Sequence, residues 1–318
     1  MKKNILVLFN NQSLKAARSV VTNLSDEKYE VIPIGITRKG RWLFYPGAYA
    51  NIENTIWEND IDCVPAILSP DNLHNGIIKL ESDEIVHKKI DLIFSLLPIK
   101  GSVQGLFELS KIPFVGASSS VSVVCSDNAY THAILEYSGM RTAKWKVITQ
   151  RKISELDAEC EKLSENLGFP LAVKPANSDK GFGKANDINS LKECVKTAFL
   201  YDSKIVVEEF ISGRALQVAM LGYGDDAVPS FVRDKNDPNF MFESDITYKV
   251  IDIARRAYKT LGVSGYALVS LFLTDTEILV DEVDTGPDLS ETGEYANLMS
   301  EIGIDYPYLL ERLINLLF

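Results

Sequence analysis

The chain has 318 residues, of which 46% are hydrophobic and 24% charged, a composition typical of a globular protein with two or three domains. Its formal net charge of -11 argues against a nucleic acid or an anionic membrane as a partner, because both would repel it. No apolar run approaches the roughly 20 residues that span a bilayer, and the four cysteines form no C-x-x-C pair. We therefore expect a cytoplasmic protein with reduced thiols and without a zinc site.

Residues 1–117 alternate short apolar runs with helical patterns, which predicts an N-terminal α/β domain. The predicted elements are strands at 4–9, 29–36 and 91–97, a helix at 13–24, and a helix followed by a short strand within 101–118. Strands that alternate with helices in this way predict a mostly parallel sheet covered by helices.

Residues 118–206 predict a small central α+β domain, and residues 207–318 predict a C-terminal α+β domain. The central elements are helices at 127–138, 153–167 and 190–200 and strands at 145–149, 171–176 and 204–211. The C-terminal elements are strands at 215–223 and 227–232, a helix at 246–261, a β-hairpin within 265–284 that turns at 274–276, and a helix at 305–318. The fold class is therefore α/β with three domains.

A lysine and two glycines form the first candidate binding element. Lys174 ends an apolar strand, and Gly181 and Gly183 lie in the loop that follows. Glycines let a backbone approach a ligand closely, and loop N–H groups can hold phosphate oxygens. A polar hairpin with a solvated lysine explains this stretch equally well.

A pair of acids followed by apolar residues forms the second candidate element. Glu208 and Glu209 end a strand and precede Phe210 and Ile211. An adenine ring needs such a combination, because it is flat and apolar and carries an exocyclic amine that a carboxylate or backbone group can bind. The alternative is a strand end with two solvated acids.

The third candidate element is "LVDEVDTGPD" at 279–288. Side chains two apart in a strand share a face, so Glu282 and Asp284 should point to one side and Asp281 to the other. Two carboxylates near a phosphate loop could hold Mg²⁺ between phosphates. The alternative is an acidic strand end that enters a turn.

These three elements, in this order, resemble the D-alanine–D-alanine ligase family of the ATP-grasp superfamily. The similarity extends over nearly the whole chain and is close in "VKPANSDKGFG" at 173–183 and "VEEFISGRALQVAMLG" at 207–222. It implies a three-domain ATP-grasp fold with ATP between the second and third domains and Mg²⁺ as the metal. It also implies a reaction in which one D-alanine is activated as an acyl phosphate and the amine of a second D-alanine attacks it.

The resemblance assigns roles to individual residues. Lys174 matches the phosphate-binding lysine, and Glu208 matches the acid that receives the adenine amine. Phe210 and Ile211 fit the hinge beside the adenine. Glu282 matches a magnesium-bridging glutamate, and Asp284 stands where the family has asparagine.

Other positions depart from the family pattern. Leu268 and Ser270 replace a basic residue and a metal-binding aspartate on the strand before the hairpin turn. The remaining departures are Lys15 for a glutamate that orients the first D-alanine, Asn128 for a nucleotide lysine, Ala215 for a ribose-binding glutamate, Gly293 near the position of a family serine, "SLLPIKG" at 95–101 for an H-G…G-E-D-G loop, and a short lid at 232–245.

Two functions are therefore compatible with the sequence. The first is an ATP- and Mg²⁺-dependent carboxylate–amine ligase that acts on amino acids, with no catalytic residue assigned. The second is a divergent ligase homologue that binds a ligand or partner without turnover. In both cases the family resemblance implies a homodimer.

Overall fold

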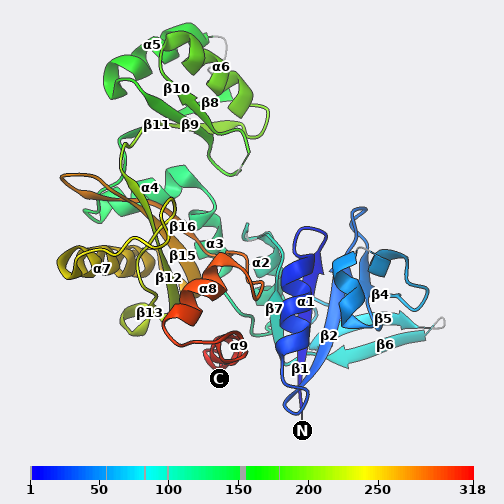
Figure 1. The fold of residues 1–318 in the computed structure, drawn as a ribbon. Coiled ribbons are helices and arrows are strands. Elements are labelled where there is room, and N and C mark those ends of the chain that lie inside the picture. Colours follow the sequence, from blue (N-terminus) through cyan, green and yellow to red (C-terminus); the bar gives the residue numbers. More distant parts are fainter. Residues whose placement is uncertain (1, 55, 82–83, 99, 151–154, 179) are drawn as a thin grey trace.

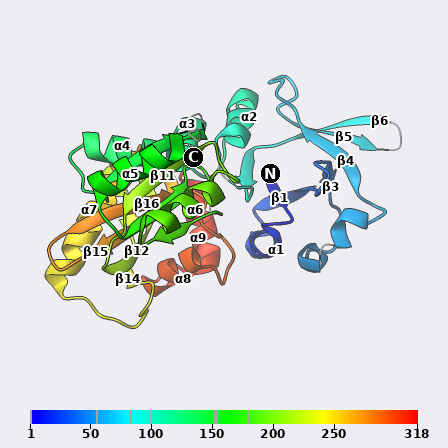
Figure 2. The same ribbon diagram turned by 90° about the horizontal axis from the view of Figure 1, so that it is seen from above.

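The computed structural model describes the chain except for residues 1, 55, 82–83, 99, 151–154 and 179, and it contains three β-sheets (Figures 1 and 2). In Figure 1 the N-terminal sheet lies beside the C-terminal sheet, and the central sheet stands above the latter. The mixed α/β architecture confirms the predicted fold class. No helix in the described part of the chain is long and apolar enough to cross a membrane.

The N-terminal sheet has the strand order β6-β5-β4-β3-β2-β1-β7. The strands are β1 (Lys3–Asn10), β2 (Tyr29–Ile36), β3 (Trp42–Phe44), β4 (Val64–Leu68), β5 (Gly76–Glu81), β6 (Glu84–Lys89) and β7 (Leu92–Ser95). Helix α1 (Leu14–Asn23) packs on one face, and α2 (Ser102–Ser110) packs on the other. Two short 3-10 helices, η1 (Tyr49–Asn54) and η2 (Ile56–Asn59), lie between β3 and β4.

The prediction of a mostly parallel sheet is wrong. Only the β1–β2 and β1–β7 pairs of this sheet are parallel among the described strands, and the four pairs from β2 to β6 are antiparallel. The physical reason is a tight turn after β2, in which the amide of Thr37 donates to the carbonyl of Arg41 and Gly40 adopts a φ of 78°. This turn returns the chain directly as a hairpin instead of through a helix. The strand predicted after α2 is a single bridge between Ile93 and Phe114.

The central sheet is antiparallel and has the order β10-β9-β11-β8. Its strands are β8 (Trp145–Thr149), β9 (Leu171–Pro175), β10 (Gly183–Ala185) and β11 (Lys204–Glu209). Helices α5 (Leu156–Leu167) and α6 (Ile188–Ala198) cover the face turned away from the C-terminal sheet (Figure 1). The predicted start of α5 at 153 lies outside the described residues.

The C-terminal sheet is built on the long strands β12 (Arg214–Tyr223), β15 (Ser264–Leu273) and β16 (Ile278–Asp284). Helix α7 (Ser244–Thr260) covers one face together with α3 (Ser119–Cys125) and α4 (Asn128–Tyr137). Helices α8 (Glu294–Glu301) and α9 (Tyr306–Asn315) join the core shared with α1 and β1. The N-terminal and C-terminal sheets therefore share one continuous core.

The strand predicted at 227–232 is also wrong. Two short strands, β13 (Val228–Pro229) and β14 (Arg233–Asp234), pair separately with β12. Between them, the Ser230 hydroxyl accepts the hydrogen bond of the Ala219 amide and donates to the Phe231 carbonyl. A side chain thus takes a bond that the backbone ladder would otherwise use, and this interrupts the strand.

Candidate functional site

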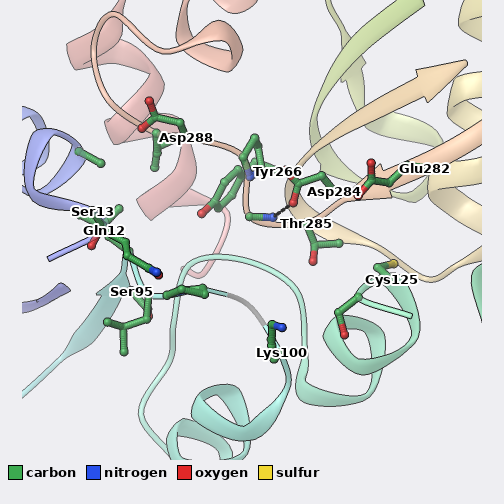
Figure 3. Close-up of a pocket in the computed structure, with 18 of the residues that line it drawn as sticks. Gln12, Ser13, Ser95, Lys100, Cys125, Tyr266, Glu282, Asp284, Thr285 and Asp288 are labelled. Carbon is green, nitrogen blue, oxygen red and sulfur yellow. Dashed lines mark hydrogen bonds between the residues drawn. The ribbon is translucent and has the colours of Figure 1, made fainter. Parts of the chain in front are cut away.

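The first cavity lies between the N-terminal and C-terminal domains and has a volume of about 570 Å³ (Figure 3). Gln12 and Ser13, which follow β1, line it from the N-terminal domain together with residues 95–98 and Lys100. Glu282, Asp284 and the turn at 285–289 line it from the C-terminal domain. Cys125, Asn128 and Ser178 add lining from the stretch between these two domains, so all three predicted regions contribute residues to the cavity.

The second cavity has a volume of about 340 Å³ and lies between the central and C-terminal sheets. The structure brings five of the predicted site residues together here: Lys174, Glu208, Phe210, Ile211 and Glu282. Phe272 and Phe182 add apolar surface. This combination of flat apolar walls and a few charged groups is typical of a small-molecule site.

Gly181 and Gly183 do not line this cavity but flank Phe182, which does. Gly181 has a φ of 93°, and a Cβ there would lie 2.6 Å from the ring of Tyr201. A Cβ on Gly183 would lie 2.5 Å from the Cys194 sulfur. In this structure, packing against Tyr201 and α6 explains why both positions need glycine.

Lys174 is partly buried, with a side chain that is 17% exposed, and it lies in a cluster of charges, so the interpretation as a solvated lysine is wrong. Its Nζ lies 2.9 Å from Glu208 Oε1 and 3.2 Å from Asp281 Oδ1. Burial alone would lower the pKa of the Lys174 amine, but the two carboxylates outweigh it and hold the pKa above its usual range. The amine is therefore charged and engaged by two acids.

Glu208 is also buried, with a side chain that is 5% exposed, so the interpretation as a solvated acid is wrong for this residue. Besides Lys174, its Oε1 contacts His132 Nε2 at 3.1 Å. Burial would raise the pKa of Glu208, yet Lys174 and the His132 hydrogen bond hold it below its usual value. Glu209, in contrast, faces Lys144 at the surface, 3.7 Å away.

Asp281 points toward the cavity, contrary to the prediction from strand alternation. Ser270 of β15 pairs with Glu282, whereas Leu271 pairs with Val280, so Asp281 is an extra residue in a β-bulge. A bulge breaks the alternation of faces, and Asp281 and Glu282 consequently both line the second cavity.

Glu282 and Asp284 lie opposite Ser270 and Leu268 of β15, respectively. Asp284 Oδ1 accepts a hydrogen bond from the Gly286 amide at 2.8 Å. The described residues contain no group of three or more His, Cys, Asp or Glu side chains that could enclose a metal. Two carboxylates still suit Mg²⁺, which commonly takes one or two protein carboxylates and completes its shell with phosphate oxygens and water.

The two cavities meet. Asn128, Ser178 and Glu282 line both of them, so a group in one cavity can contact a group in the other. From the sequence, Asn128 is recognised only as a departure from the family pattern, and Ser178 has no predicted role. Only the folded chain shows that both residues lie where the two cavities meet. His132 gave no sequence signal either, since it lies in the middle of an amphipathic helix.

Comparison with known proteins shows the family. Models of the D-ala D-ala ligase N-terminus and C-terminus match residues 11–117 and residues 134–248 and 239–315, respectively. A D-alanine–D-alanine ligase from Acetivibrio thermocellus is 32% identical, over 99% of this chain and 96% of its own. The vancomycin/teicoplanin A-type resistance protein VanA of Enterococcus faecium is 33% identical, over 96% of this chain and 93% of its own.

Among solved structures, the VanG D-Ala:D-Ser ligase from Enterococcus faecalis superposes with a TM-score of 0.91 at 28% identity, and the match covers all of both chains. ATP and Mg²⁺ are the cofactors of this family. The chain therefore belongs to the D-alanine–D-alanine ligase family of ATP-dependent ligases, which have the ATP-grasp fold.

Proposed function

We propose that the chain joins two small amino acids in an ATP- and Mg²⁺-dependent reaction, through an acyl phosphate of the first. One observation carries this proposal: the two cavities share Asn128, Ser178 and Glu282. A carboxylate in the first cavity would then lie beside the terminal phosphate of a nucleotide in the second. Holding two reactants at contact in this way is a large part of what a ligase contributes.

In the second cavity we assign the nucleotide roles. Phe210 and Ile211 form the apolar wall for the adenine, and Glu208, the buried acid of this cavity, is assigned to its exocyclic amine. Lys174 is the cation for the phosphates, and Glu282 and Asp284 would hold Mg²⁺ at the junction. When bound, Mg²⁺ supplies charge neutralisation for the transferred phosphoryl group.

The first cavity is proposed to hold the amino acids. D-alanine and D-serine are the first substrates to test, because the relatives named above are described as D-Ala–D-Ala and D-Ala:D-Ser ligases. Asp288 lies on the same side of the cavity as Gln12 and Ser13 in the view of Figure 3, and these polar groups can bind an ammonium group. The three domains, with boundaries near residues 117 and 206, are proposed as well, since there are three separate sheets; β11 of the central sheet extends to Glu209, and α3 and α4 pack on the C-terminal sheet.

The test is release of phosphate from Mg-ATP in the presence of a panel of D- and L-amino acids. We expect phosphate release that depends on a D-amino acid. Glu282→Gln should lower the rate of this release by about tenfold or more, because the variant loses a charged group at the junction. Thermal shift with Mg-ATP in the same samples reports nucleotide binding separately. Binding without phosphate release across the panel would instead favour the non-catalytic homologue.

We also propose a cytoplasmic homodimer. β6 is an edge strand, and Ile67, Leu80 and Ile85 on β4 to β6 are each about half exposed or more. Exposed apolar side chains on a sheet edge are suited to contact a second copy. Light scattering should give the mass of a dimer for the wild-type chain and that of a monomer for Ile85→Lys. A monomeric wild-type chain would refute this part of the proposal.

A further inference from the structure

We propose that Lys100 binds the reacting carboxylate of the first amino acid and stabilises the negative charge that develops as its acyl phosphate forms. This inference rests on the proposed function and names the cation that serves it. Among the described residues that line the first cavity, three carry carboxylates: Glu282, Asp284 and Asp288. Lys100 is the one Lys, Arg or His side chain among the described residues that line it.

Lys100 is an exposed residue, and the backbone that follows it is constrained. Gly101 follows it with a φ of 83°, and a Cβ there would lie 2.3 Å from Val123 Cγ2 and 3.0 Å from the Ser119 carbonyl oxygen. Only glycine fits such a turn, and α2 begins at the next residue. The Lys100 side chain lines the cavity and lies below Thr285 and Asp284 in the view of Figure 3.

One hydrogen bond orients the amine. Lys100 Nζ donates to the carbonyl of Asn177 at 3.0 Å. Asn177 lies just after β9, the strand that carries Lys174, so the bond links the N-terminal domain to the nucleotide side of the site. An ammonium group has three donors. The remaining ones are available to a carboxylate or to an oxygen of its phosphate.

No other described residue that lines the two cavities supplies a free cation. Lys174 is engaged by Glu208 and Asp281, as described above. On β15, the residues opposite Asp284 and Glu282 are the buried Leu268 and the neutral Ser270. A carboxylate that enters a cavity edged with acids needs a compensating charge, and Lys100 provides it from the opposite wall.

The experiment compares the wild-type chain with Lys100→Met and Lys100→Arg. Lys39→Met is the control, because Lys39 is an exposed residue of the same domain and lines neither cavity. Calorimetry measures binding of D-alanine to the protein loaded with Mg²⁺ and a non-hydrolysable ATP analogue, and binding of that analogue alone. Phosphate release is measured in parallel, and melting temperatures show whether each variant folds.

We expect Lys100→Met to weaken D-alanine binding by about tenfold and to lower kcat by about 10²–10³-fold, the usual effect of losing one donor to a developing negative charge. Lys100→Arg should restore most of both losses, because the charge is kept. Affinity for the ATP analogue should not change in either variant.

Several outcomes would overturn the inference. The first is that Lys100→Met binds D-alanine as tightly as the Lys39→Met control and has the same kcat. The second is that Lys100→Met loses affinity only for the ATP analogue, which would indicate that Lys100 only holds Asn177 in place. If the wild-type chain binds D-alanine in a Lys100-dependent way but releases no phosphate, the proposed function and the transition-state role of Lys100 fall, and its role in binding the carboxylate stands. If it neither binds D-alanine nor releases phosphate, both fall.

Discussion

Replacing Lys174 by methionine tests whether the charge cluster between the central and C-terminal sheets is built as described. The substitution keeps most of the side-chain volume and removes the amine that contacts Glu208 at 2.9 Å and Asp281 at 3.2 Å. Glu208 is then left buried with His132 as its remaining partner in the cluster. Removing one partner of a buried ion pair generally costs about 3–5 kcal/mol, because the other charge stays desolvated.

Glu208→Gln should cost less, about 1–2 kcal/mol. In that variant the Lys174 amine keeps Asp281, whose side chain is 25% exposed and so is partly hydrated. The double variant Lys174→Met/Glu208→Gln should be less destabilised than the two single losses predict together, because it leaves no unpaired buried charge. Lys174→Met should therefore lower the free energy of unfolding more than Glu208→Gln does, because the Lys174 amine keeps a second acidic partner when Glu208 is replaced.

Urea unfolding followed by circular dichroism at neutral pH measures these free energies. Lys259→Met is the control, because its ion pair with Asp225 lies at the surface with side chains 56% and 76% exposed, and we expect little change. Lys174→Met should also abolish the rise in melting temperature that Mg-ATP produces in the wild-type chain. A loss in Lys174→Met no larger than in the control, or smaller than in Glu208→Gln, would refute the reasoning.

Three further predictions concern the same region. The pKa of Glu208 in the folded chain lies below its ordinary value of 4.5. The Glu208 carboxylate therefore contributes its full stabilisation above pH 4.5 and loses it as the pH falls through the folded-state pKa. On acidification below pH 4.5, the melting temperature of Glu208→Gln should fall less than that of the wild-type chain. Glu282→Gln should raise the Mg²⁺ concentration needed for half-maximal nucleotide binding by about tenfold, with metal-free nucleotide binding unchanged, and an equal effect in both titrations would contradict a metal role. Gly181→Ala should lower stability by about 1–3 kcal/mol in urea unfolding, since it adds a Cβ 2.6 Å from the Tyr201 ring at a φ of 93°, and wild-type stability would show that this loop adapts freely.

The central domain was the most predictable part of the fold. Strands β8, β9 and β11 contain short apolar runs, and helix α6 has one apolar face, so periodicity places them within a few residues. The three-residue strand β10 was not predicted, because it lies in the glycine-containing stretch that the sequence indicates as a loop. The outer half of the N-terminal sheet was not predictable in this way. β3 has only three residues, and β6 buries neither face fully, so neither shows the alternation on which strand prediction depends.

For the candidate site, the sequence predicts the residues at strand ends but not the residues that contact them from distant parts of the chain. Lys174, Glu208 and Glu282 stand where apolar runs stop, which is a local signal. His132 and Asp281 contact them from 76 and 107 residues away along the chain, and no local pattern records such a contact. Only the folded structure shows that the lysine predicted for phosphate is held by carboxylates.

That arrangement changes what nucleotide binding must involve. A phosphate that approaches Lys174 meets an amine already paired with Glu208 and Asp281, and these two acids would repel it. Binding therefore has to shift the Lys174 side chain away from one acid or add positive charge at the junction. Glu282 and Asp284 stand where a divalent cation could add that charge. It follows that nucleotide affinity in this chain should depend steeply on Mg²⁺, and that Asp281→Asn, which removes one competing acid, should make the dependence weaker.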